Sequence, residues 1–339
     1  MRGLKLATKL IGLTEGKKTT KKHLKLIEWL QKKKILRGKV KCSRCHHKMK
    51  LKKKIASVDR FEWRCQRRNC KRKKSIRHKS IFTRSKVSVF NWMKFVYRFS
   101  QGLRLRQLDF MMDNIARSSR TLSRMAKQLR EVCVTAMERL RQREGQRIGG
   151  RRHFVVIDES HFRHKRKYGR GRMAGGWKRR KWVFGMLGVQ STRMQPGRRQ
   201  PGQRPRGPRR RSGKPVLCLV EKRGRRELVP LIAHHVKRGS CVISDEWRAY
   251  RNALPQLGYR HFTVNHSVSY VSAETGAHTQ HIERAWRSYK ETVWRLRGNR
   301  TEQLLIDHLY VIEWHAWLGG KHQHGPLGRL LYDMRLKYR

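Results

Sequence analysis

The strongest constraint on this chain is its charge. Lys and Arg number 86 against 22 Asp and Glu, which gives the 339 residues a formal net charge of +64. A compact fold with this excess repels itself unless a polyanion neutralises it, and the common polyanion is nucleic acid. Disorder is the simplest outcome of so much charge. However, hydrophobic residues make up 37% of the chain and 27 glycines are added to them, which is near the apolar share of globular proteins. We therefore expect a folded, very basic protein that binds nucleic acid.

An anionic membrane is the competing polyanion. The sequence contains no run of about 18 apolar residues, so we expect no spanning helix and no membrane partner. The seven cysteines are an odd number with uneven spacing. This pattern favours metal ligands or free thiols in a reducing compartment over a disulfide framework.

Four of the cysteines form two close pairs, Cys42 with Cys45 and Cys65 with Cys70. Two knuckles that each present two thiolates suit a tetrahedral zinc ion. His46 and His47 could replace a cysteine, so the spacing leaves the ligand set open. For so small a module, the energy of binding Zn²⁺ would be folding energy.

Changes in composition divide the chain into four predicted parts. These are a basic arm or helix (1–37), a zinc-ribbon-like module (38–83), a helical region resembling a helix-turn-helix (84–148) and an α/β domain (149–339). Residues 192–214 contain four of the eight prolines and eight arginines. We expect this segment to be a disordered basic insertion. It could be a solvated loop without a specific role or a segment that contacts DNA.

The α/β assignment depends on short apolar runs that are typical of buried strands. They lie at 154–157, 181–189, 215–220 and 241–243. Helix-like segments follow the last two runs, at 228–236, 279–297 and 301–318. Three hairpin-like strands followed by helix, strand and helices indicate a mixed α/β fold.

Acidic residues are scarce, so their positions are informative. Asp158 and Asp245 each follow a strand-like run, and the carboxyl ends of strands are where α/β sheets place their sites. Glu283 lies early in a long predicted helix, with Trp286 and Lys290 on the same face. Three carboxylates could hold two Mg²⁺ or Mn²⁺ ions, and Lys290 could meet a phosphate.

From spacing alone, these acids could equally have purely structural roles. An acid after a strand is often a turn or helix cap, and a helical Glu is usually solvated. Glu159 and Glu246 stand beside the two Asp residues. They should point elsewhere because side chains alternate along a strand, so they are second choices as ligands.

Three blocks, in order along the chain, resemble the catalytic blocks of Merlin-family DNA transposases. They are 156–162 with 165–172 and 182–185, then 243–250, and then 276–290. A segment with Cys65, Gln66, 75–77 and 80–82 is similar to the family's segment after its zinc knuckles. The resemblance covers roughly residues 38–335.

The resemblance implies an RNase H-like catalytic domain in which Asp158, Asp245 and Glu283 bind divalent metal. Related bacterial elements often carry Asn where Gln280 stands here. An amide is neutral, so we assign the third ligand to Glu283. The resemblance also implies binding of terminal inverted repeats and cut-and-paste transposition of double-stranded DNA.

Three functions are compatible with these residues. The first is an active transposase of the DDE type, that is, one with an Asp-Asp-Glu metal site, which cleaves and joins DNA strands. The second is a domesticated, transposase-derived protein that binds DNA without catalysis. The third is a structural zinc protein of a ribonucleoprotein. The three acids and Lys290 are all present, which favours the first.

For DNA recognition we expect the zinc module and the helices of 84–145 to read the terminal repeat. Residues 107–130 are compatible with a helix-turn-helix unit. Its candidate DNA contacts are Arg117, Arg120, Thr121 and Arg124. The alternative is a packing bundle with a solvated basic face. Because two DNA ends must meet, we expect a homo-oligomer. The resemblance and the basic cluster at Lys17–Lys22 imply action in the nucleus.

Overall fold

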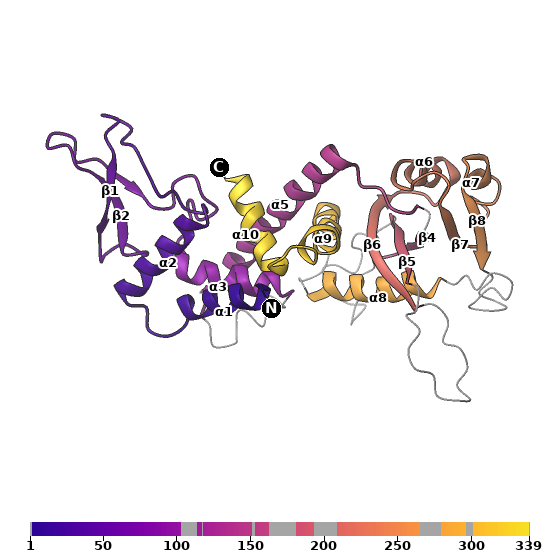
Figure 1. Ribbon diagram of the computed structural model, residues 1–339, viewed down its shortest axis with the longest axis horizontal. Coiled ribbons are helices and arrows are strands. Elements are labelled where there is room, and N and C mark those ends of the chain that lie inside the picture. The colour runs from indigo at the N-terminus through magenta and orange to yellow at the C-terminus, as the bar shows by residue number, and fades with distance from the viewer. Residues whose placement is uncertain are drawn as a thin grey trace, which may run out of the picture. The chain divides into compact units, whose positions relative to one another are not determined.

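The computed structural model describes residues 2–102, 114–116, 118–150, 153–162, 181–192, 209–264, 279–295 and 301–338. The chain separates into two compact units (Figure 1). The first unit comprises Met1–Ala136 and Leu318–Arg339, and the second comprises Met137–Trp317. Within the described ranges, no helix has the length and apolar character needed to cross a membrane.

Helices build most of the first unit. They are α1 (Arg2–Thr14), α2 (Thr20–Lys32), α3 (Val89–Ser100), the first part of α5 (Ser119–Glu144) and α10 (Gly325–Lys337). The hydroxyls of Thr19 and Ser88 accept backbone N–H groups at the starts of α2 and α3, as N-caps do. Helix α1 packs on α2, α3 and α10. Residues 1–37, predicted as a basic arm or helix, therefore form two helices of a packed core.

A small antiparallel sheet completes the first unit. Its strands are β1 (Met49–Lys53), β2 (Phe61–Cys65) and β3 (Lys73–Ser75), in the order β1-β2-β3. Met49 pairs with Cys65, so the β1–β2 ladder ends at a cysteine of the predicted zinc module.

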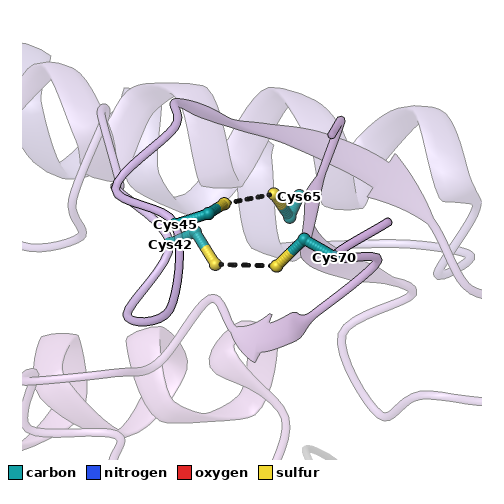
Figure 2. Close-up of side chains that lie close together, drawn as sticks. All are labelled: Cys42, Cys45, Cys65 and Cys70. Carbon is teal, nitrogen blue, oxygen red and sulfur yellow. Dashed lines mark hydrogen bonds between the residues drawn. The ribbon is translucent and has the colours of Figure 1, made fainter. Parts of the chain in front are cut away.

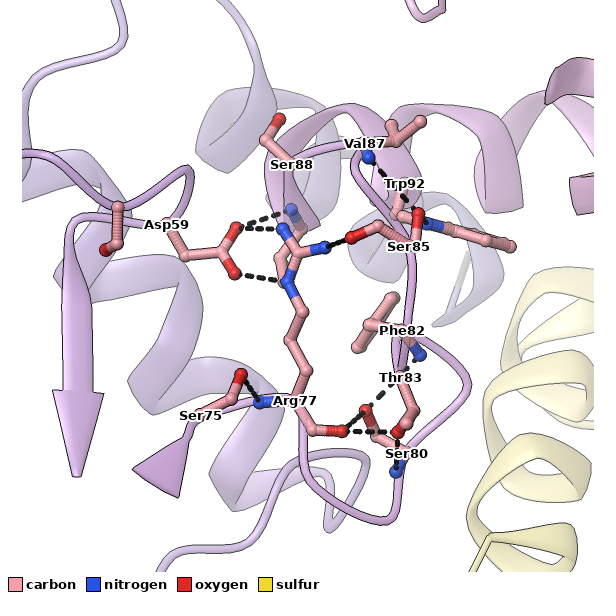
Figure 3. Close-up of polar contacts among 12 residues, drawn as sticks. Asp59, Ser75, Arg77, Ser80, Phe82, Thr83, Ser85, Val87, Ser88 and Trp92 are labelled. Carbon is pink, nitrogen blue, oxygen red and sulfur yellow. Dashed lines mark hydrogen bonds and ion pairs between the residues drawn. The ribbon is translucent and has the colours of Figure 1, made fainter. Parts of the chain in front are cut away.

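A buried ion pair joins this sheet to α3 (Figure 3). The carboxylate of Asp59 accepts from Nε and Nη2 of Arg77, the latter at 2.8 Å, and from the backbone N–H of Val89 at 2.9 Å. Arg77 also donates to the carbonyl of Ser85. Both side chains are almost fully buried. The pair therefore fixes the segment after β3 against the first residue of α3.

The second unit is built on a five-stranded mixed sheet. Its strands are β4 (His153–Ser160), β5 (Trp182–Thr192), β6 (Arg209–Val220), β7 (Cys241–Asp245) and β8 (Arg260–Val264). Their order is β6-β5-β4-β7-β8 (Figure 1). Strands β4, β5 and β6 are antiparallel neighbours, whereas β7 and β8 run parallel to β4. Strand β8 was not predicted, because only Val264 in it is buried and its other residues give no apolar run.

Both faces of this sheet are buried, as expected when helices cover a mixed sheet. Val156 and Ile243 belong to a core cluster with residues of α8 (Gln280–Arg295) and α9 (Glu302–Trp314). Val155 and Val242 alternate with them and are fully buried on the other face. Among the described residues, the other elements are the helices α6 (Arg225–His235) and α7 (Ala253–Gln256) and a π-helix (His315–Gly319).

Two predicted boundaries were wrong. Strand β5 extends to Thr192 and β6 begins at Arg209, where the two residues pair, so the basic insertion predicted at 192–214 is too wide at both ends. Residues 193–208 lie outside the described ranges. The last helix, α10, packs on α1 and α3 in the first unit, although 149–339 was predicted as one domain. Composition does not reveal which surface an apolar helix face will meet.

Candidate functional site

The parallel pairing of β4 and β7 aligns the two predicted aspartates. Val156 pairs with Ile243, and Asp158 and Asp245 each lie two residues beyond that pair. Side chains two residues apart share a face, and neighbouring strands lie about 4.8 Å apart. The two carboxylates therefore stand beside each other, on the same face as the core formed with α8.

Asp158 is held by two hydrogen bonds. The indole N–H of Trp286 donates to Oδ2 and the backbone N–H of Glu159 donates to Oδ1, both at 2.8 Å. Burial raises the pKa of Asp158 to about 6, the two hydrogen bonds oppose this, and the charges of Asp245 and Glu283 raise it further. Asp158 therefore lies within electrostatic range of Asp245 and Glu283.

Helix α8 supplies the third acid and the lysine. Glu283 lies in the first turn, is exposed, and accepts a hydrogen bond from the hydroxyl of Thr279 at 3.0 Å. Lys290 lies two turns further on, with Nζ 5.8 Å from the centre of the Phe162 ring. Burial lowers the pKa of Lys290, and the charge of Asp158 partly offsets this. The lysine is therefore near the acid that α8 anchors.

Gly185 makes room for this anchor, and it was not among the predicted site residues. It pairs with Asp158 across β4 and β5. A Cβ atom at this position would lie 2.4 Å from Cη2 of Trp286. The signal was a glycine inside a strand-like run, which often marks the close approach of another group.

Glu159 points to the opposite face of β4, as alternation predicts. Its buried carboxylate accepts from the hydroxyl of Tyr250 and lies 3.9 Å from a guanidinium nitrogen of Arg223. Burial raises its pKa to about 7. Glu246 follows Asp245 and is exposed. Glu159 therefore does not share the face of the aspartate pair.

The carboxylate set is suited to hard divalent cations, because these prefer oxygen ligands and would neutralise adjoining negative charges. Its ligand atoms lie farther apart than those of the cysteines. In the described part of the chain, only the four cysteines bring three or more metal-binding atoms within 4.8 Å of one another.

The four cysteines form one cluster (Figure 2). Its members are Cys42, Cys45, Cys65 and Cys70. Sγ of Cys42 lies 3.5 Å from that of Cys70, and Sγ of Cys45 lies 3.4 Å from that of Cys65. A tetrahedral site with Zn–S bonds of about 2.3 Å places sulfurs about 3.8 Å apart, so the cluster fits zinc.

The backbone favours thiolate at this cluster. N–H groups of Cys45 and Arg44 lower the pKa of Cys42 to about 6. Backbone N–H groups also act to lower the pKa of Cys65 and Cys70, but burial and the neighbouring cysteines outweigh them and raise both pKa values, that of Cys65 to about 12. Neither His46 nor His47, the possible substitutes, joins the four sulfurs, and Nδ1 of His47 contacts the carbonyl of Cys45 at 3.0 Å. The geometry therefore favours a four-cysteine set.

Three of the predicted DNA-contacting residues, Arg120, Thr121 and Arg124, lie at the start of α5. Arg120 and Arg124 are exposed one turn apart on α5. Thr121 is part of the cap, since its backbone N–H donates to the hydroxyl of Ser118 at 3.2 Å. Arg117 and residues 103–113 lie outside the described residues, so the helix-turn-helix prediction stays a prediction.

A comparison with known protein families gives a match over part of the chain. Residues 140–295 match the family model described as the ISXO2-like transposase domain. This range contains Asp158, Asp245, Glu283 and Lys290. No curated protein matches the chain. The match supports a transposase of the DDE type, an enzyme class that acts on DNA with divalent metal, in the second unit of this chain.

Proposed function

We propose that this protein is an active DDE transposase that binds terminal inverted repeats and catalyses metal-dependent strand cleavage and strand transfer. The observation that carries the proposal is the position of Asp158 and Asp245 at the same level of two adjoining parallel strands. The charge of Glu283 on α8 raises the pKa of Asp158. The mixed sheet with helices on its core face is consistent with an RNase H-like domain.

Asp158, Asp245 and Glu283 would hold Mg²⁺ or Mn²⁺. When bound, a pair of such ions can activate a water or 3′-hydroxyl and stabilise the leaving oxygen of a phosphodiester. The protein itself would orient the carboxylates and the DNA phosphate. Trp286 orients Asp158 through a hydrogen bond, and Lys290 offers a positive charge to a phosphate on the same side of α8.

In this proposal the first unit binds the DNA ends. Zinc at the four cysteines would stabilise the small sheet, and α5 would present Arg120 and Arg124 to DNA. The excess of 86 basic residues would be neutralised mainly by phosphates. We expect affinity to fall steeply with salt concentration.

The finer assignments depend on the resemblance. Merlin-like, cut-and-paste transposition requires two ends in one complex, so we propose a homo-oligomer. The exposed basic residues around Lys17 and Lys18, between α1 and α2, would support action in the nucleus. A domesticated DNA-binding protein is the alternative, and the presence of all three acids argues against it.

The test is cleavage of duplex DNA that carries the element's own ends, in Mg²⁺ or Mn²⁺. The natural protein is compared with Asp158→Ala, Asp245→Ala and Glu283→Ala. We expect each variant to bind the ends and to lose cleavage. Gln280→Ala serves as the matched control on the same helix and should keep activity.

Two results would overturn parts of the proposal. Binding of the ends without cleavage in either metal would favour the domesticated protein. Activity that survives only in Glu283→Ala would show that the third ligand is misassigned, and Gln280 or Glu246 would be the next candidates.

A further inference from the structure

An exposed tryptophan stands beside the aspartate pair. Trp247 follows Asp245 by two residues, and its backbone N–H donates to Oδ1 of Asp245 at 3.2 Å. Its side chain is 38% exposed, whereas most large apolar side chains in the described residues are buried. A large aromatic group therefore meets solvent next to a candidate catalytic carboxylate.

Trp247 is held rigidly. Its indole N–H donates to the carbonyl of Arg223 at 2.8 Å. The guanidinium of Arg223 lies 4.5 Å from the ring centre of Trp247 and 4.1 Å from that of Trp182. Trp182 in turn contacts the ring of His161. The exposed indole is thus the end of a continuous stack whose base is the sheet.

Arg223 also connects the stack to β4, the strand that carries Asp158. Arg223 lies 3.9 Å from the buried carboxylate of Glu159, the residue that follows Asp158. An indole fixed at its backbone, its N–H and one ring contact loses little freedom when a second flat group stacks on it. Nucleobases are flat, and stacking on aromatic side chains does not require a particular base.

We propose that Trp247, supported by Arg223, is a stacking platform for an unpaired nucleobase of the DNA that enters the carboxylate site. The inference rests on the proposed function, since it takes DNA as the substrate of the second unit. Arg223 adds a positive charge, which complements a nearby phosphate. The platform would position the strand relative to Asp158 and Asp245 through the base rather than the backbone.

Photocrosslinking tests the stacking platform in the whole protein with zinc bound. No Mg²⁺ or Mn²⁺ is added, because the probe must not be cleaved. The probe is a hairpin duplex with an unpaired tail that carries one 5-iodouracil, moved along the tail in separate probes. We expect a tail position that crosslinks to the peptide containing Trp247. Trp294→Ala is the matched control, because Trp294 is 50% exposed in the same unit.

Affinity gives a second readout. A tail with an abasic residue at the crosslinking position should bind more weakly than the normal tail, by about 5- to 150-fold. Trp247→Ala should remove that difference, Trp247→Phe should keep part of it, and Trp294→Ala should keep all of it.

The platform is overturned if the tail is bound but no position crosslinks to Trp247. It is also overturned if Trp247→Ala keeps the full preference for the base, or if Trp294 takes the crosslink instead. These results differ from failure of the proposed function, in which the natural protein would not cleave its own DNA ends in either metal. Because crosslinks are mapped in the natural protein, the test does not depend on whether a variant folds.

Discussion

The indole N–H of Trp286 donates to Oδ2 of Asp158 at 2.8 Å, although the two residues are 128 positions apart in the chain. The bond joins α8 to the end of β4. Glu283 and Lys290 lie on the same helix, so the contact that orients one acid also locates the helix that carries the other two groups. The geometry of the carboxylate site therefore depends on a contact between distant parts of the chain.

Gly185→Ala should displace Trp286, because the new Cβ would lie 2.4 Å from Cη2 of the indole. Overpacking of this kind costs about 1–3 kcal/mol. We expect that loss in urea unfolding and a larger proportional loss of cleavage activity. Gly188→Ala is the control in the same strand, since the nearest atom to its Cβ would be at 3.5 Å. Equal effects of the two substitutions would contradict the prediction.

Trp286→Phe keeps an aromatic ring against Gly185 but removes the donor to Asp158. A hydrogen bond to a charged group contributes about 1.5–3 kcal/mol. We expect cleavage and Mn²⁺ affinity to fall roughly 10- to 150-fold while DNA binding is kept. Mn²⁺ binding can be measured by electron paramagnetic resonance. Unchanged Mn²⁺ affinity would show that the indole fills space against Gly185 and that its hydrogen bond to Asp158 does not matter for metal binding.

Asp59→Ala should destabilise the first unit strongly. The guanidinium of Arg77 would lose its carboxylate while staying buried, and the N–H of Val89 would lose its acceptor. Removing one partner of a buried ion pair costs about 3–5 kcal/mol. Thermal unfolding of the full chain measures the loss. The exposed pair Lys181 and Glu221 provides the control, because Glu221→Ala should change stability little.

Removal of zinc should unfold the sheet of the first unit. We expect about one zinc per chain by atomic emission, lost on chelation or in Cys42→Ser and Cys70→Ser. Cys133→Ser, at a cysteine outside the cluster, should retain the metal. Binding of DNA ends should fall with the metal. Full zinc content in Cys42→Ser would exclude this site.

Glu313 predicts a pH dependence of stability. Its buried carboxylate meets Arg141 and the backbone N–H of Leu217, each at 2.8 Å, yet burial raises its pKa to about 7. A carboxyl group with a raised pKa stabilises the fold below its unfolded pKa, and this contribution is lost as the pH rises through the folded pKa.

The measurement compares the natural protein with Glu313→Gln, which cannot titrate. Between about pH 4.5 and 7 the natural protein should lose on the order of 3 kcal/mol of unfolding free energy relative to the variant. Above that range the difference should be constant. A difference that does not change with pH would mean that Arg141 keeps the carboxylate charged throughout.

The sequence by itself determined the features that depend on residues close together in the chain. Runs such as 154–157 identified strands because burial on both faces requires consecutive apolar residues. Asp158 and Asp245 were chosen as candidate ligands because each lies at the end of such a run. The paired spacing of the cysteines predicted their cluster, since each knuckle is closed by its own few residues.

Only the tertiary structure decided what depends on partners distant in the chain. The register of β4 with β7 places Asp158 beside Asp245, and the gap at Gly185 admits Trp286 from α8. Strand pairing likewise shortened the predicted insertion, and helix packing placed α10 in the first unit. Residue types restrict such contacts but do not choose among them, because each apolar face can be buried against several surfaces and the choice follows from how the whole core packs.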